Sequence, residues 1–514
     1  MKKLFSSSLK LPKRARPQVS LSRLYNRLRL ISAGGRWSTR LSARVRHSLR
    51  WLIFDGILAN TSDAIIMAYQ SVYLLTLGAS KSQIGTLDAL SNLAMPIAMV
   101  PGGRMAARAA KYKWLVVVPA LVSRLLLFGL AFLPFLGTTT STLVYAGIAI
   151  VVLRAFLTNL LNPAWTAMLG TLVPIQWRGR YFSTRNILMG GAAFFALLGV
   201  GRLIDLTGSP LGYQLAFGIA ALTGLGASYA LSRVEETPRV VPKRARRDWT
   251  SLWTQARQHR RFVLLCVTAA LWNFAQRIAG PFFNVFFADG LQASAALIGV
   301  ASAAATLAAL PGQRIFGLLN DRKGARWVQR LTGFVIPVVP FLWGVLTRPW
   351  QALPVEVLSG FVWAGYNLAA FNLLLEMTPD EDRPSFVAAY QAVVGLGMAG
   401  GALVGGWLAQ AQGYRAVFFT SAAGRLLAAT VFALVIGEER PAEPEEPAPA
   451  ETVPTVVQPD ESASVVEVGD AVLEEVSPDE EARPDEEAAM TPAAGPAEDT
   501  AGPGMAEAEE EDGD

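Results

Sequence analysis

An acid and a base stand in the middle of long apolar segments, where each could hold a proton or the charge of a solute. Asp63 lies in the apolar run at about 51–77, and Arg277 lies in the run at about 262–288. A charged side chain at the centre of a bilayer costs roughly 2.5–3.5 kcal/mol on insertion scales, so each residue needs a partner or water. Both residues are therefore candidates for ion coupling or solute binding.

Each of these two charges shares a helical face with further polar side chains. Asp63 precedes Gln70 by seven residues, and Arg277 precedes Asn284 by the same seven, a spacing that returns to one helix face. A shift of 214 residues superimposes Asp63 on Arg277 and Gln70 on Asn284. We expect Asp63 and Arg277 to lie at equal depth and to pair, or to take turns in holding a charged solute. The alternative is a salt bridge with a purely structural role.

The fourth and tenth apolar runs carry polar and aromatic residues. Arg154, Asn162 and Trp165 share one helical face. A shift of 205 places Asn162 on Asn367, which lies close to Trp363 in the sequence. Aromatic rings with a few polar groups are a common lining for organic ligands. Ordinary hydrogen bonding and packing between helices would use the same residue types.

The elements that position these residues are apolar runs long enough to cross a membrane. A transmembrane helix needs about 20 apolar residues to span ~30 Å of hydrocarbon. Only helices and closed barrels satisfy the backbone in lipid, and these runs are too continuously apolar for barrel strands. We therefore predict an all-α membrane protein with twelve transmembrane helices, at about 51–77, 82–103, 114–135, 142–168, 184–205, 212–232, 262–288, 293–319, 326–347, 352–377, 385–409 and 414–436.

The first six runs and the last six repeat each other. The shift of 214 places Gly85 on Gly299, and the shift of 205 places Gly201 on Gly406. A duplicated membrane domain with a central site between its halves is the architecture of many secondary transporters. The repeat therefore predicts two pseudo-symmetric six-helix halves around a shared site.

Charge is distributed unevenly along the chain. Residues 1–50 carry 14 Lys/Arg and no acid, and the loop at 233–261 carries nine Lys/Arg. The positive-inside rule then places both termini in the cytoplasm. Residues 438–514 carry 26 acids and two bases and are rich in Pro and Ala, a composition that cannot bury a core and predicts disorder.

These patterns divide the chain into five parts. They are a basic cytoplasmic N-terminal segment (1–50), a first six-helix half (51–232), a basic cytoplasmic linker (233–261), a second six-helix half (262–437) and a disordered acidic cytoplasmic tail (438–514). The one cysteine, Cys266, implies neither a disulfide nor a zinc site. No cleavable signal precedes the first run, and the composition fits a bacterial inner membrane.

The end of the eighth run carries a recognisable loop motif. It reads GLLNDRKGAR and begins at Gly317. This stretch resembles the loop signature of the major facilitator superfamily, roughly G-x-L-x-D-R-x-G-[RK]-[RK], which Gly317, Asp321, Arg322 and Gly324 fit. The equivalent stretch of the first half, GRMAARAAKY, has Ala107 where the second half has Asp321.

The resemblance covers about 51–436 and implies a central cavity between spans one, four, seven and ten. On that arrangement the polar faces named above look into water. Arg154 resembles the buried arginine of the family's second motif. Arg124 and Arg425 fall on spans that the family uses as outer scaffold, so we expect structural roles for both. Asp88 lies near the outer end of span two, where it can reach the interface.

The loop motif is expected to gate the cytoplasmic side. Gly317 would let two helices approach closely, and Asp321 would meet the positive start of span five, near Ser183. Because Ala107 replaces the acid in the other copy, the latch is expected to be asymmetric. The alternative is that Asp321 and Arg322 only cap a short turn.

The segment between spans four and five, together with span five, bears on which group within the family the chain resembles. It contains NPAWTAMLGTLVPIQWRGRYFSTRN and looks like that of a bacterial group without a settled substrate. The Gly-Pro signature of drug/proton antiporters is missing from span five, which argues against drug efflux. Trp165 and Trp363 argue for it.

We therefore interpret the chain as a secondary active transporter of a small organic solute that works by alternating access. Alternatives are proton-coupled multidrug-type efflux and a membrane sensor or scaffold that transports nothing. Arg154 and Arg277 outnumber Asp63, which favours an anionic or zwitterionic solute, and Asp63 is the expected carrier if protons drive transport. No nucleotide-binding loop or catalytic cluster is visible, so we expect no cofactor, no metal and no enzymatic activity. Membrane lipids are the other expected partners, without nucleic acid, and the protein is expected to be a monomer.

Overall fold

The computed structural model describes residues 36–436 apart from 175–176, 237, 239–258 and 379–382. In this part of the chain, twelve helical segments are long and apolar enough to cross a membrane. The predicted all-α fold with twelve spans is therefore confirmed. Most of the basic N-terminal segment, most of the linker and the acidic tail lie outside the described residues.

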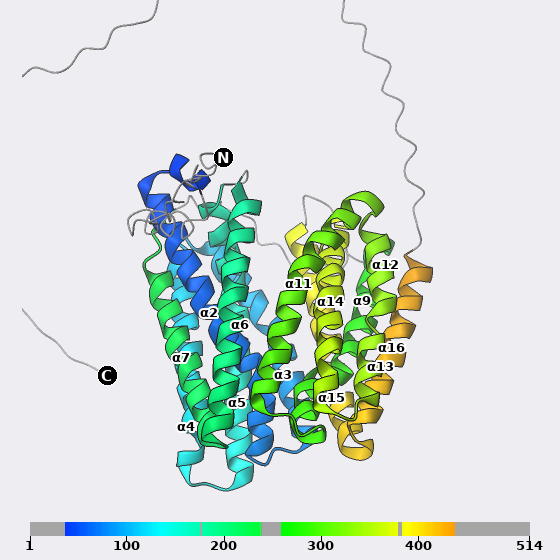
Figure 1. Cartoon of the computed structure of the whole chain (residues 1–514). Coiled ribbons are helices and arrows are strands. Elements are labelled where there is room, and N and C mark those ends of the chain that lie inside the picture. The colour runs from blue at the N-terminus through cyan, green and yellow to red at the C-terminus, as the bar shows by residue number, and fades with distance from the viewer. Residues whose placement is uncertain (1–35, 175–176, 237, 239–258, 379–382, 437–514) are drawn as a thin grey trace, which may run out of the picture. The chain divides into compact units, whose positions relative to one another are not determined.

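The first six spans form the first half of the bundle (Figure 1). They are α2 (Ala43–Thr76), α3 (Lys81–Arg108), α4 (Lys113–Phe132) with η2 (Leu133–Leu136), α5 (Thr140–Leu172), α6 (Arg178–Thr207) and α7 (Leu211–Ser232). Helix α2 begins well before the predicted residue 51, because Ser42 caps its first turn through a bond to the Val45 N–H. The basic first turns of this helix extend beyond the apolar run that marks the span.

The last six spans form the second half. They are α9 (Arg260–Ala279) continuing through η4 (Gly280–Phe282), α10 (Phe283–Val285) and η5 (Phe286–Gly290), then α11 (Ala295–Lys323), α12 (Ala325–Val335) with α13 (Val338–Val345), η6 (Pro349–Gln351) with α14 (Ala352–Glu376), α15 (Arg383–Gln412) and α16 (Tyr414–Val435). The seventh span is irregular at Pro281, because proline removes a backbone donor and clashes with the preceding turn.

The span order gives the bundle two ends. Helix α2 begins, and helices α3 and α11 end, at one end of the bundle, which we call the basic end. The turns that follow α2 and precede α11 lie at the opposite end, which we call the far end. Arg108 and Arg322 lie at the basic end.

The two halves meet through helix pairs that obey the internal repeat. Helix α3 packs against α15, and α6 packs against α11 (Figure 1). A Cβ on Gly299 would lie 3.1 Å from the carbonyl carbon of Leu197, and one on Gly201 would lie 2.6 Å from the Ala295 oxygen. Only glycine allows backbones this close. Gly85 and Gly406 make the matching contact between α3 and α15.

In the described part of the chain, clusters of buried apolar residues join the halves toward the far end and near the middle of the bundle. One large cluster of buried residues toward the far end contains residues from both halves, including Tyr69 and Phe286. Toward the basic end, one cluster around Met168 contains only first-half residues, and another around Phe262 contains only second-half residues. In the described part of the chain, the structure is therefore closed at the far end and divided at the basic end.

Candidate functional site

Asp63 lies at mid-span in α2, where two arginines from neighbouring helices share its carboxylate. Arg124 of α4 donates from Nη1 to Oδ1 at 2.7 Å, and its Nη2 lies 3.3 Å from Oδ2. Arg154 of α5 donates from Nη2 to the same Oδ1. A carboxylate accepts a bidentate guanidinium well, so this arrangement satisfies a charge that lipid could not.

The face of α2 that carries Asp63 is not covered by other helices. The Asp63 side chain is 40% exposed, whereas those of Arg124 and Arg154 are 11% and 13% exposed. Met67, one turn further on the same face, is 77% exposed. Because a carboxylate facing hydrocarbon is costly, we assign this face to the water-filled side of the helix.

The expected pair between Asp63 and Arg277 is not formed, so that prediction is wrong for this conformation. Arg277 of α9 instead donates from Nη1 to Oδ1 of Asp88 on α3, at 3.3 Å. Asp88 also accepts a bond from Asn92 at 2.9 Å. The repeat placed Asp63 and Arg277 correctly in equivalent helices, but each side chain binds the nearest opposite charge.

The Asp88–Arg277 bond connects the two halves. The side chains are 20% and 28% exposed, so both are largely withdrawn from solvent. The sequence suggested that Asp88 reaches the membrane interface from the outer end of span two, but its carboxylate pairs with Arg277 instead. For an acid two turns inside an apolar helix, pairing with a cation on the opposite half costs less free energy than reaching bulk water.

Arg425 of α16 lies behind Arg277 and is 1% exposed. Its Nε donates to Ser421 Oγ at 3.1 Å, and its Nη2 donates to the Gln276 main-chain oxygen at 3.2 Å. These acceptors are neutral, and no acid forms an ion pair with Arg425 in the described structure. Arg425 therefore adds a positive charge next to Arg277 without neutralising it.

Asn284 and Gln70, the other members of the two polar faces, differ in their contacts. Asn284 Nδ2 donates to the Ala68 main-chain oxygen on α2 at 3.1 Å, which is a bond between the halves. Gln70 is partly buried. Asn284 therefore helps to close the far end in this conformation.

Asn162 and Asn367, the pair related by the repeat, are both exposed on α5 and α14. Asn162 Oδ1 accepts a bond from Thr166 at 3.3 Å. Trp165 is partly buried, and the Arg185 guanidinium lies 5.4 Å from the centroid of its ring. The two asparagines therefore present amide groups to the surroundings, whereas Trp165 packs within its own half.

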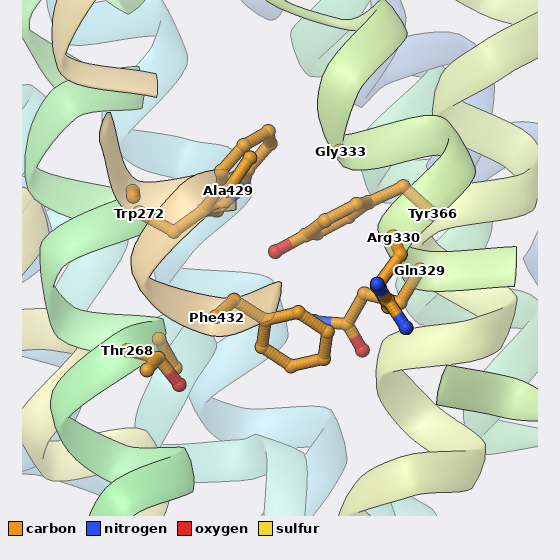
Figure 2. A pocket seen from close by; sticks show the side chains of 10 residues that line it. Thr268, Trp272, Gln329, Arg330, Gly333, Tyr366, Ala429 and Phe432 are labelled. Atoms are coloured by element: carbon orange, nitrogen blue, oxygen red, sulfur yellow. The ribbon is translucent and has the colours of Figure 1, made fainter. Parts of the chain in front are cut away.

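Trp363 belongs to an aromatic cluster inside the second half. Its ring centroid lies 5.5 Å from that of Tyr366 and 6.3 Å from that of Trp272, and Trp272 stacks on Tyr366 at 4.6 Å. Trp272 and Tyr366 border a small pocket between α9, α12, α14 and α16 (Figure 2). Its free volume of about 10 Å³ holds one water molecule, so an organic solute does not fit.

The loop motif at the end of α11 is exposed and does not act as a latch here. Asp321 and Arg322 are solvent-accessible, as is Ser183, the expected partner region on α6. Gly317 does not bring helices together, because a Cβ there would meet only Leu368 at an ordinary 3.9 Å. The close approach between α11 and α14 occurs one and a half turns earlier, at Gly312, where a Cβ would lie 2.6 Å from the Phe361 oxygen.

Gly324 has a clear backbone role. Its φ is +83°, in the left-handed region that favours glycine, where α11 ends and α12 begins. The first-half copy has Ala110 at the equivalent position, and no left-handed residue occurs there. The first copy therefore does not need a glycine at this position.

The sequence analysis missed two residues that hold the halves together. The carboxylate of Asp205, near the end of α6, accepts bonds from the Ala295 and Ala296 N–H groups at 2.8 and 3.0 Å. The hydroxyl of Tyr69 on α2 donates to the Ala295 oxygen at 3.0 Å. A lone acid at the end of an apolar helix was the available signal for Asp205, because the start of another helix supplies unpaired N–H donors.

Arg124, for which the sequence suggested a structural role, also contacts Asp63. It is the one charged residue in the middle of its span and therefore needed a partner within reach. The sequence does not show which acid that is, because the partner lies on another helix.

Comparisons with known proteins agree with this arrangement. The family description Major Facilitator Superfamily matches residues 52–278 and 265–476, once for each half. No curated protein matches the chain in sequence.

Solved transporters share the fold at low sequence identity. The nucleoside transporter NupG is 16% identical, with a TM-score of 0.58 over 76% of this chain and 100% of that chain. A bacterial homolog to the human lysosomal transporter Spinster, in an inward-facing and occupied conformation, is 14% identical, with a TM-score of 0.57 over 75% and 95%. A D-xylose–proton symporter is 16% identical, with a TM-score of 0.55 over 80% and 97%. The chain therefore belongs to the Major Facilitator Superfamily and is a transporter, not an enzyme.

Proposed function

We propose that this transporter moves a small organic solute across the membrane by alternating access. The observation that carries the proposal is the accessible Asp63 carboxylate at mid-span, held by Arg124 and Arg154 in a bundle whose halves join at one end only. A carrier needs a binding group at mid-depth that solutes can reach from one side of the membrane. Movement of the two halves then exposes this group to the other side.

The distribution of basic residues gives the proposed orientation. Arg108 and Arg322 lie at the basic end, so the positive-inside rule assigns that end to the cytoplasm. The structure then corresponds to an inward-open conformation in a cell inner membrane. The same rule places both termini in the cytoplasm and supports the division into two halves joined by a basic linker.

The gating motif fits this orientation. In an inward-open conformation Asp321 and Arg322 would be exposed, as they are here, and would engage α6 when the cytoplasmic side closes. The proposed cavity would contain the polar residues of spans one, four, seven and ten, namely Asp63, Gln70, Arg154, Asn162, Trp165, Arg277, Asn284, Trp363 and Asn367.

Cysteine accessibility tests alternating access. The native Cys266 is buried and is replaced by alanine to give a silent background. Single cysteines at Asn162 and Asn367 are then labelled with a membrane-impermeant thiol reagent in oriented vesicles. We expect labelling from the cytoplasmic side, and protection when a bifunctional reagent links cysteines placed at Asp321 and Ser183. Labelling that is unaffected by this link would contradict alternating access.

Coupling to protons is proposed through Asp63. Proteoliposomes that contain the wild-type chain are expected to concentrate a solute in response to a proton gradient, and Asp63→Asn is expected to lose this accumulation but to keep exchange. Accumulation by Asp63→Asn at the wild-type level would exclude Asp63 as the carrier.

A further inference from the structure

Apart from the balanced pair of Asp55 and Arg185 in the first half, six charged side chains form ion pairs and hydrogen-bonded contacts around the middle of the bundle. They are Asp63, Asp88, Arg124, Arg154, Arg277 and Arg425. Four are arginines and two are aspartates, so the cluster carries a formal charge of +2 in the conformation described here. An excess charge inside a membrane requires a counter-ion or water.

Counted by the half that supplies each residue, the excess comes from the second half. In the first half Asp63 and Asp88 balance Arg124 and Arg154. The second half contributes Arg277 and Arg425 and no acid to the cluster. Two acids of this half lie outside the cluster: Glu356, one turn from the far-end start of α14, forms no ion pair in the described part of the chain, and Asp289 of η5 accepts a bond from the Tyr414 hydroxyl.

Arg277 is therefore neutralised by a residue of the opposite half. Its single contact with Asp88, at 3.3 Å, is monodentate, in contrast to the bidentate bond between Arg124 and Asp63. Arg277 Nε is buried without a hydrogen-bond partner. A guanidinium with N–H groups that donate to nothing can bind a second anion, or can exchange the anion it already holds for another.

Alternating access would break this contact. The far end must open in the outward-facing conformation, which moves α3 away from α9 and takes Asp88 away from Arg277. The second half would then hold two arginines at mid-depth with only neutral acceptors. An anion that neutralises these two arginines has to come from the water-filled side.

We propose that the transported solute carries an anionic group, a carboxylate or a phosphate, and that Arg277 binds this group in place of the Asp88 carboxylate. This inference rests on the proposed transport function and adds the substrate class. Arg425 supports the site from behind by raising the local positive potential, and Asp88 returns to Arg277 when the solute leaves.

Chemical rescue tests the anion site without knowledge of the solute. Asp88→Asn removes the carboxylate that Arg277 binds, and acetate is the probe, with acetamide as its uncharged control. We expect saturating acetate, and not acetamide, to raise the thermal unfolding midpoint of purified Asp88→Asn by ~2 °C or more, because a ligand stabilises the folded state that binds it. Asp88→Asn/Arg277→Gln is expected to lose the response, whereas Asp88→Asn/Arg202→Gln, which removes an exposed arginine of α6, keeps it.

Two results would overturn the proposal. One is the absence of any acetate response in Asp88→Asn, and the other is a response that survives Arg277→Gln. If Asp88→Asn does not fold, Asp88→Ser is used in the same way. Asp88→Asn/Arg277→Lys keeps the charge and is expected to retain a weaker response.

Transport assays test the anionic substrate separately from the proposed transport function. Counterflow into proteoliposomes is measured with matched pairs, glucuronate with glucose and uridine 5′-monophosphate with uridine. We expect the acid of a pair to be carried, with affinity lowered ~10–100-fold in Arg277→Gln, as for a lost hydrogen bond to a charged group. Uptake of neutral members only would overturn the anionic substrate and leave the transporter assignment intact. An acetate response without uptake of any member would support the anion site and remove the proposed solute transport.

Discussion

Gly85 of α3 and Gly406 of α15 meet so closely that a Cβ on Gly406 would lie 2.9 Å from the Cα of Gly85. The contact lies toward the far end and joins the two halves. Its equivalent under the internal repeat joins α11 and α6 at Gly299 and Gly201. Both helix pairs therefore depend on residues without side chains at equivalent positions.

Enlarging Gly406 is expected to prevent closure of the far end. A leucine there would collide with the backbone of α3, and backbone atoms do not move aside as the tip of a side chain does. Gly406→Leu should therefore favour the conformation that is open at the far end. Labelling of a cysteine at Lys81 with an impermeant thiol reagent should become faster, and solute transport should fall.

Gly199→Leu provides the matched control for this change. It makes the same substitution in a span, but a Cβ at Gly199 meets nothing within 4 Å. Labelling and transport should remain near the wild-type values. Equal effects of the two substitutions would show that the close approach at Gly406 does not decide closure.

Removal of the Asp63 charge is expected to destabilise the first half. Asp63→Asn leaves Arg124 and Arg154 without their shared anion. Breaking a buried ion pair costs roughly 3–5 kcal/mol, and the 40% exposure of Asp63 lowers our expectation to about 1–3 kcal/mol. Denaturant unfolding in detergent measures the change. Asp321→Asn, the same substitution at an exposed site, should stay within about 0.5 kcal/mol of wild type.

Asp205 should determine how firmly α6 and α11 hold together. Its carboxylate accepts both N–H groups at the start of α11, and loss of such a cap costs typically about 1 kcal/mol. Asp205→Ala should increase thiol labelling at the far end, and Asp205→Asn, which keeps one acceptor, should have a smaller effect. Equal labelling in Asp205→Ala and wild type would contradict a closing role.

Gly324→Ala tests the turn between α11 and α12. An L-residue in the left-handed region costs roughly 1–2 kcal/mol, so this change should lower the free energy of unfolding by about that amount. Gly103→Ala is the control, since Gly103 lies inside α3 with nothing within 4 Å of its Cβ position. That substitution should be neutral or slightly stabilising, because alanine favours helix.

Periodicity and the repeat predicted the architecture well. Hydrophobic length identified the twelve spans, because lipid permits few other backbone arrangements. The repeat identified Gly85 and Gly201 with their partners Gly299 and Gly406, and the structure places all of them at contacts between the halves. Gly397 and Gly401 of α15 likewise lie against the backbone of α9.

The ion pairs could not be predicted in the same way. Pseudo-symmetry gives the depth of a residue and the helix that carries it, but not the opposite charge nearest to it in space. Asp63 had an arginine on each of two neighbouring helices, so it did not need Arg277. Arg277 had no acid in the cluster from its own half, and its partner Asp88 came from the other half.

The symmetric glycine contacts bear on the history of the chain. A six-helix unit that carries equivalents of both Gly85 and Gly201 presents one surface that fits a second copy of itself, since each glycine lies against the backbone of the partner. Such a unit could pair as a homodimer before fusion into one polypeptide. Fusion then freed the two copies to diverge, and the aspartate at position 63 and the arginine at position 277 record that divergence at equivalent sites.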